Sequence, residues 1–178
     1  MKGVLFNVVE DVVTEAMSAD AWDDVVDESG VSGAYTSLGD YPDAELVSLV
    51  GATASAASLT ETETLQLSGR LGFKHLVSRA PHLLDGIDGW REVLGALDDI
   101  IHPEVRKIYP DADVPGFEAV AEGNALLVTY VSKRGLCALA DGLVLGCGEW
   151  FETPLAVEHL SCIHTGDDAC TMRVTEVE

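Results

Sequence analysis

The spacing of apolar residues changes near Pro110 and Pro115, and this change limits the fold more than any other feature. Before it, apolar residues recur every three or four positions, which is the period of an amphipathic α-helix. After it come short β-like runs separated by turn residues. Helices followed by a small group of strands are typical of the α+β class. We therefore predict an α+β fold with a helical N-terminal part.

Five helices are predicted before this change. Thr60 and Glu63 form a capping-box pattern ahead of the fourth helix, Pro81 starts a short turn, and Pro110 ends the fifth helix. The predicted helices cover residues 3–17, 21–26, a segment that opens at 41–43 and runs through 50, 65–77 and 88–109. Residues 1–60 are thus expected to be wholly helical.

Beyond Pro115 the sequence predicts two hairpins and one further helix. Turn residues at 122–124 and at 165–168 each separate two β-like runs. The predicted strands are 117–121, 125–131, 155–164 and 169–177, and the inserted helix is 135–150. This order predicts a small antiparallel sheet of about four strands. No internal repeat or long linker is present, so we predict a single domain over 1–178, with the long helix and the sheet in 61–178.

The chain is strongly acidic, with 31 Asp and Glu against 10 Lys and Arg and a formal net charge of −21. Nucleic acid is not an expected partner, because binding a polyanion requires basic side chains that displace its counterions. Such a charge opposes folding through self-repulsion unless salt screens it. A halophilic source with a salt-rich cytoplasm explains the composition best. An ordinary acidic surface that aids solubility is the alternative.

Membrane and secretory segments are not expected. No apolar run free of Gly, Pro and charge reaches the roughly 20 residues of a membrane span. Residues 1–6 are followed by Glu10 and Asp11 too soon for a secretory signal, so we expect a cytoplasmic protein. No nucleophile motif or glycine-rich phosphate loop is present, and the sequence does not predict an enzyme.

His102 is the first candidate for chemistry, because it follows Ile101 on the apolar side of the predicted long helix. A neutral imidazole at this position could coordinate a metal. Pro103 lacks the amide that would bond the Asp99 carbonyl, so we expect strain or a kink beside the imidazole. The alternative is a core or boundary histidine whose hydrogen bonds are satisfied.

Tyr130, Ser132 and Arg134 form a second candidate site where a predicted strand runs into a helix. The alternation of a strand places Tyr130 and Ser132 on one face, and Arg134 can follow at its end. A phenol, a hydroxyl and a guanidinium in this arrangement would bind carboxylates. A solvated sheet face is the alternative.

Together with Met1-Lys2-Gly3 at the start, the histidine helix and the Tyr-x-Ser-x-Arg motif resemble the haem nitric oxide/oxygen binding (H-NOX) domains, relatives of the sensor domain of soluble guanylate cyclase. The resemblance extends over essentially the whole chain. It implies haem b with ferrous iron, His102 as the proximal ligand, and Tyr130, Ser132 and Arg134 as the residues that hold the haem propionates. It also suggests that Pro115 matches the proline that presses on the haem plane.

The resemblance also indicates which gas binds. Bound oxygen is partly anionic and benefits from a hydrogen-bond donor, whereas bound nitric oxide needs little such help. Oxygen-binding members of the family have a tyrosine on the helix after Tyr-x-Ser-x-Arg, and here Leu139 aligns with it. Leu5 and Val9 would complete an apolar pocket. This favours nitric oxide and carbon monoxide as ligands, although these residues would also suit an ordinary core.

The cysteines form a third candidate site. Cys162 and Cys170 flank the second hairpin turn, His159 precedes Cys162 by three residues, and Cys137 lies on the preceding helix. Three thiolates and an imidazole suit a tetrahedral zinc site, and these four residues resemble the ligand set of a zinc-containing H-NOX group. His164 is a competing nitrogen ligand. A disulfide between Cys162 and Cys170, or unrelated buried thiols, are the alternatives, and Cys147 is left over as a buried helix residue.

The resemblance implies a sensor that acts on a separate protein, commonly a histidine kinase, a diguanylate cyclase or a chemotaxis receptor. In the family, nitric oxide weakens the bond between iron and histidine, and the histidine helix then moves. The second hypothesis is a zinc-stabilised module that has lost haem and binds a small ligand or a protein, with a structural His102.

Overall fold

The computed structural model describes residues 1–177 and confirms the α+β class. Up to residue 108 the helices are the only extended elements, and four strands with one helix between them follow. The expectation that residues 1–60 are wholly helical was wrong, because residues 30–42 form a non-helical connection that includes an isolated bridge between Lys2 and Asp40. The helices are α1 (Gly3–Ala16), α2 (Ala19–Ser29), α3 (Asp43–Ala57), α4 (Glu61–Arg79), α5 (Trp90–Ala96), α6 (His102–Ile108) and α7 (Cys137–Trp150). The strands are β1 (Gly116–Glu122), β2 (Ala125–Val131), β3 (Leu155–Ser161) and β4 (Cys170–Glu176).

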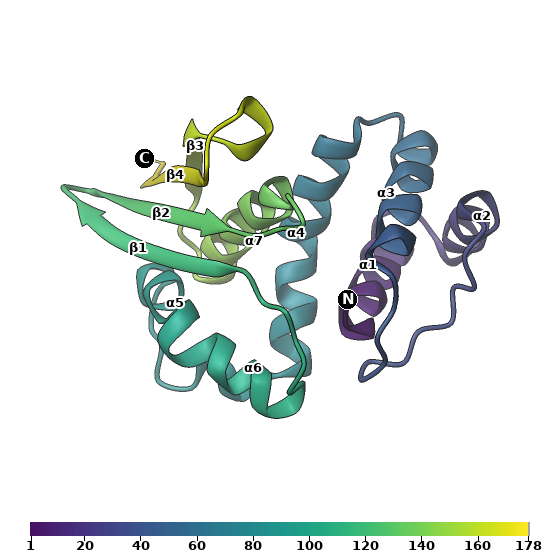
Figure 1. Ribbon diagram of the computed structural model, residues 1–178, viewed down its shortest axis with the longest axis horizontal. Coiled ribbons are helices and arrows are strands. Elements are labelled where there is room, and N and C mark those ends of the chain that lie inside the picture. Colours follow the sequence, from purple (N-terminus) through teal and green to yellow (C-terminus); the bar gives the residue numbers. More distant parts are fainter. Residues whose placement is uncertain (178) are drawn as a thin grey trace.

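The elements form two parts on either side of α4. Helices α1, α2 and α3 lie together on one side, and the sheet with α5, α6 and α7 lies on the other (Figure 1). Each part has its own cluster of buried apolar side chains. The N-terminal cluster centres on Phe6, Val13, Val25 and Leu49. The larger cluster joins α5 and α7 to the inner face of the sheet.

The sheet is antiparallel, with the strand order β1-β2-β4-β3. Strand β2 pairs with β1 on one side and β4 on the other, so it carries the centre of the buried face. Val128 pairs with Met172, and both side chains are completely buried. Tyr130 pairs with Cys170 at the end of the same face. The end of the sheet where Tyr-x-Ser-x-Arg leaves β2 therefore lies next to the cysteine-bearing end of β4.

Glycines bring α4 and α7 into backbone contact. A Cβ atom at Gly142 would lie 1.9 Å from the carbonyl oxygen of Gln66, and one at Gly69 would lie 2.3 Å from that of Leu139. At Gly146 it would lie 2.4 Å from the carbonyl oxygen of Arg70. No side chain fits at these distances, so the three glycines fix how closely the two helices approach.

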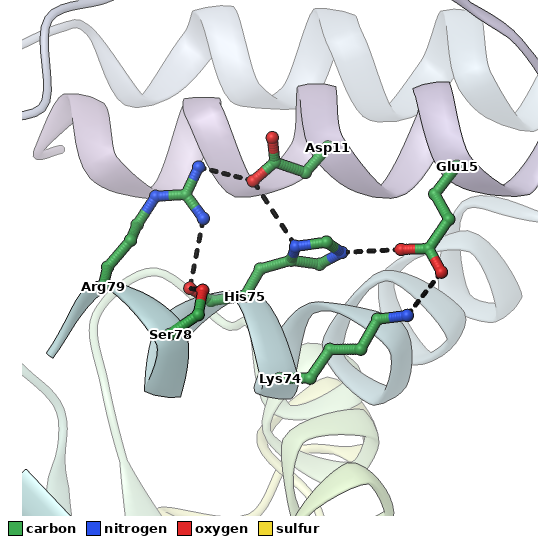
Figure 2. A network of polar contacts seen from close by, with 6 residues as sticks. All are labelled: Asp11, Glu15, Lys74, His75, Ser78 and Arg79. Carbon is green, nitrogen blue, oxygen red and sulfur yellow. Dashed lines mark hydrogen bonds and ion pairs between the residues drawn. The ribbon is translucent and has the colours of Figure 1, made fainter. Parts of the chain in front are cut away.

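An ion-pair network joins α1 to α4, as Figure 2 shows. The His75 imidazole on α4 lies between two carboxylates of α1, with Nε2 3.0 Å from Glu15 Oε2 and Nδ1 3.6 Å from Asp11 Oδ2. Lys74 pairs with Glu15, and Arg79 pairs with Asp11. The N-terminal helices are thus held to α4 at this edge by charged groups.

The predicted single helix over 88–109 is the main difference from the sequence-based expectation. The chain forms α5, then a wider π-helical turn at Leu97–Ile101, and then α6. The His102 amide donates to the carbonyl of Leu97, five residues back, instead of the usual four. Pro103 has no amide to continue the ladder, so the kink expected from this proline takes the form of a π turn directly before His102.

Smaller differences concern the ends of elements. Helix α2 extends to 19–29 because Ser18 accepts a hydrogen bond from the Ala21 amide and Gly30 ends the helix in the left-handed conformation. Strand β3 ends at Ser161, and residues 163–165 form a 3₁₀ turn instead of strand.

Among residues 1–177, no helix has the length and apolar character needed to cross a membrane.

We predict that Gly142→Ala destabilises the protein by about 1–3 kcal/mol or more, because the new methyl group would displace the α4 backbone. Gly95→Ala is the matched control, since nothing lies within 4 Å of a Cβ at this exposed position of α5. The control should gain about 0.5–1 kcal/mol from helix propensity. Urea unfolding followed by circular dichroism measures both. Equal stabilities would show that α4 and α7 are not in backbone contact.

Candidate functional site

The His102 side chain lies at the start of α6 and is held by Asp98. Its Nδ1 donates a hydrogen bond to Asp98 Oδ1 at 3.1 Å, and the other oxygen of this carboxylate accepts the Phe117 amide at 3.0 Å. Because a carboxylate only accepts, this bond places the proton on Nδ1 and leaves the Nε2 lone pair available. Burial lowers the pKa of His102, and Asp98 offsets this only in part. The structure thus provides an oriented, neutral imidazole.

Asp98 was not predicted as a site residue. It lies four residues before His102, and side chains at this spacing meet on one face of a helix. That spacing was the available signal. The sequence shows Asp98 next to Asp99 as well, and only the fold reveals that the Asp98 carboxylate also binds the start of β1.

Aromatic rings connect His102 with the second predicted site. The Phe117 ring lies 5.8 Å from the His102 ring and 5.3 Å from the Tyr130 ring, measured between centroids. Tyr130 is buried on β2, and burial raises the pKa of its phenol. Pro115 is half-buried and lies two residues before Phe117, at the entrance to β1.

Arg134 already binds carboxylates in this structure. Its Nε lies 2.7 Å from Asp43 Oδ2, and its Nη1 donates to the Asp113 carbonyl at 2.6 Å. The N-terminal amino group lies 3.1 Å from the other oxygen of Asp43. Burial pushes the pKa of Asp43 up, but hydrogen bonds from the amino terminus and Arg134 outweigh it and lower the pKa. Ser132 accepts a hydrogen bond from the Arg134 amide at 3.2 Å. The motif therefore ends in a guanidinium placed to bind an acidic group.

Leu5, Val9 and Leu139 come together as predicted, around a small cavity of about 30 Å³ between α1, α3, α4 and α7. Its walls are almost entirely apolar, and no tyrosine is among them in the described chain. A water molecule needs roughly 10–15 Å³ of such space, so this cavity is a small one. His102, Tyr130 and Arg134 do not line it.

Three of the four predicted metal ligands form a cluster. The Sγ atoms of Cys137, Cys162 and Cys170 all lie within 4.8 Å of one another. Cys162 Sγ lies 3.7 Å from that of Cys137 and 3.6 Å from that of Cys170. Zinc with thiolate bonds of about 2.3 Å in a tetrahedron requires sulfur atoms about 3.8 Å apart. The three thiols thus have the spacing of three corners of a zinc site. Burial and the neighbouring thiols raise the pKa of Cys137 to about 12, so bound metal must displace protons.

The histidines differ from the predicted arrangement. His159 is not among the three thiols; its Nε2 lies 2.8 and 2.7 Å from the two carboxylate oxygens of Asp141. His164 donates from Nε2 to the Gly135 carbonyl at 2.8 Å. Cys147 is completely buried in the core, apart from the cluster. Asp141 was missed because nothing in its local sequence distinguishes it from the other acidic residues.

A β-bulge explains how His159 and Cys162 come to share one face. Side chains alternate along a strand, so residues three apart would normally point to opposite faces. Here His159 pairs with Met172, but Ser161 pairs with Thr171, which leaves Leu160 as an extra residue. Because of this shift, His159 and Cys162 both lie on the face of Met172 and Cys170.

An oriented neutral imidazole, a carboxylate-binding arginine and a small apolar cavity are features expected of a haem protein that binds small gases. The comparisons with known proteins agree. The Haem-NO-binding family matches residues 2–159. The chain belongs to this family, and the resemblance to H-NOX domains is confirmed.

Solved H-NOX structures match over the full length of the chain. A protein from S. oneidensis in the Fe(II)NO state is 28% identical, with a TM-score of 0.93 and complete coverage of both chains. The same identity holds for an H-NOX domain from Shewanella oneidensis in the Fe(II)CO state, with a TM-score of 0.90, covering 100% of this chain and 99% of that one. An unliganded Fe(II) protein from K. algicida is 26% identical, with a TM-score of 0.86, covering 100% and 97%. No curated protein matches the chain.

Proposed function

We propose that the chain is a nitric oxide sensor in which His102 ligates ferrous haem iron through Nε2. The observation that carries this is the bond from Nδ1 to Asp98, which fixes the ring and leaves Nε2 for a metal. Haem supplies the iron at which a diatomic gas binds. Membership of the Haem-NO-binding family supports haem over the alternative of a haem-free module.

The residues of Tyr-x-Ser-x-Arg are proposed to hold the haem propionates. The guanidinium of Arg134 is oriented toward carboxylates by its present contacts with Asp43 and Asp113, and a propionate would engage the same donors. Pro115 enters β1 close to the residues that hold His102, which supports a role against the haem plane. Tyr130 contributes a buried phenol at the end of β2.

Asp98 gives His102 a connection to the sheet. The Asp98 carboxylate accepts hydrogen bonds from both the imidazole and the Phe117 amide. A movement of His102 would therefore be transmitted to the start of β1. The backbone hydrogen bonds of the π turn before His102 span five residues, whereas those of the α-helices span four. Such turns are frequent at functional sites. We propose that this segment passes the signal to a separate protein, such as a histidine kinase, a diguanylate cyclase or a chemotaxis receptor.

The first test concerns the ligand. His102→Ala should abolish retention of ferrous haem, because no other imidazole is oriented at this position, and free imidazole should restore it. Visible absorption spectra of the purified variants measure haem content. His164→Ala is the control and should keep the wild-type spectrum, since His164 bonds Gly135 beside the thiol cluster. Full haem occupancy with an unchanged spectrum in His102→Ala would refute the assignment.

Nitric oxide is the proposed ligand because the cavity formed by Leu5, Val9 and Leu139 offers bound oxygen no tyrosine hydroxyl, and Ser68 is the one hydroxyl-bearing residue in its lining. Nitric oxide and carbon monoxide do not depend on such a donor. The S. oneidensis relatives, which have structures in the Fe(II)NO and Fe(II)CO states, support both gases as ligands of this chain.

The second test supplies the missing donor. Leu139→Tyr should raise oxygen affinity about threefold to tenfold, the effect of one neutral hydrogen bond of roughly 0.5–1.5 kcal/mol. Leu139→Phe is the matched control, because it adds the ring without the hydroxyl, and it should show no gain. Oxygen titration of the ferrous proteins measures the effect. A wild-type protein that holds oxygen stably in air would rule out the nitric oxide assignment.

We further propose that Cys137, Cys162, Cys170 and His159 bind zinc. The sulfur spacing supports the three thiolates. His159 lies on the same face of the sheet as Cys162 and Cys170 and would move toward the metal as the fourth ligand.

The third test is metal content. Wild-type protein should contain about one zinc per chain by elemental analysis, and Cys170→Ser should lose it because three ligands of a tetrahedral site do not hold the ion as tightly. Cys147→Ser is the control and should keep the zinc, since Cys147 lies outside the cluster. A metal-free wild type with all thiols free after reducing purification would exclude the site.

A further inference from the structure

Asp141 is the only acidic residue among the buried side chains of the described chain. It lies on α7, and burial raises the pKa of its carboxyl, while His159 opposes the shift. The His159 imidazole is its partner, with Nε2 2.8 Å from one carboxylate oxygen and 2.7 Å from the other. Burying a carboxylate costs desolvation free energy unless the group is paired. The His159 imidazole is the group that offsets this cost for Asp141.

The position of Asp141 connects it with the thiol cluster. It follows Cys137 by four residues, so both side chains lie on the same face of α7, one turn apart. The bulge at Leu160 places His159 on the face of β3 that this helix covers. Asp141 and Cys137 on α7 thus lie against His159 on β3 and Cys162, which follows this strand.

We propose that Asp141 is a positioning residue for a zinc site: its carboxylate accepts a hydrogen bond from Nε2–H of His159 and thereby presents Nδ1 as the fourth ligand. The proposal rests on the zinc site proposed above. A carboxylate only accepts hydrogen bonds, so its contact with Nε2 places the proton there and leaves the lone pair on Nδ1. Metal-binding histidines commonly donate their second nitrogen to a carboxylate in this way, which fixes the tautomer and the ring orientation.

The other charged group near His159 does not compete for this role. Glu158 precedes it on β3 and points to the opposite face, where it accepts a hydrogen bond from Arg173 at 3.3 Å. Zinc binding would release the three thiol protons to solvent, while His159 stays neutral and its Nε2–H remains hydrogen-bonded to Asp141. His159 would then turn about this bond toward the three sulfur atoms.

Asp141→Asn tests the proposal, with Glu158→Gln as the matched control that removes the carboxylate next to His159 on the opposite face of β3. The amide introduced by Asp141→Asn can donate as well as accept, so it no longer fixes the proton on Nε2, and zinc affinity should fall by about 10–100-fold. The control should keep wild-type affinity. Competition with a chromophoric chelator measures both in the full chain as purified.

A second measurement requires no variant. Long-range nitrogen-proton correlation spectra, recorded under carbon monoxide so that any ferrous haem is diamagnetic, identify the protonated nitrogen of His159. In the zinc-loaded wild type we expect the proton on Nε2 and the metal on Nδ1. Binding through Nε2, or an unchanged or tighter affinity in Asp141→Asn, would overturn the role of Asp141 and leave the zinc site intact. A wild type that binds no zinc would overturn both.

Discussion

The backbone contact between α4 and α7 fixes the helix that serves both the apolar cavity and the thiol cluster. The glycines Gly69, Gly142 and Gly146 allow the two helices to touch, and no other residue type would permit this distance. Helix α7 then carries Leu139 to the apolar cavity and Cys137 to the thiol cluster. Helix α4 presents Lys74, His75 and Arg79 to α1, and Gly72 lets the α1 side chains approach.

The N-terminal helices are joined to this frame by apolar packing around the cavity and, at its edges, by ion pairs. Lys74 and Arg79 hold α1, and Arg134 holds the start of α3 through Asp43. Three of the ten lysines and arginines of the chain therefore lie at this boundary. These groups are partly exposed, so salt weakens their attraction even as it relieves the repulsion of a net charge of −21. The tightness of this boundary consequently depends on the ionic environment more than the glycine contact does.

The sequence predicted the features that depend on local pattern. Apolar spacing located the helices and hairpins, and the order of the elements gave the α+β class. Pro103 predicted a kink, but the π turn itself depends on which carbonyl accepts the His102 amide, and the sequence does not show this. The Tyr-x-Ser-x-Arg motif marked Arg134, whereas its partner Asp43 lies 91 residues away and looks like any surface acid until α3 is docked. For the same reason Asp141, one of 31 acidic residues, could be recognised only from the fold, whereas the spacing of Asp98 from His102 was a signal in the sequence.

Helix α7 also separates the two sites that it helps to build. Leu139 lies two residues from Cys137 and two from Asp141, and two residues correspond to about 200° around a helix. Leu139 therefore faces the cavity beside α1, while Cys137 and Asp141 face β3 and β4. A change at the thiols reaches the cavity only if α7 moves as a whole, and its glycines are already in contact with the α4 backbone. The bulge at Leu160 and the turn after Cys162 lie instead in the β3–β4 hairpin, on the side of α7 away from the cavity.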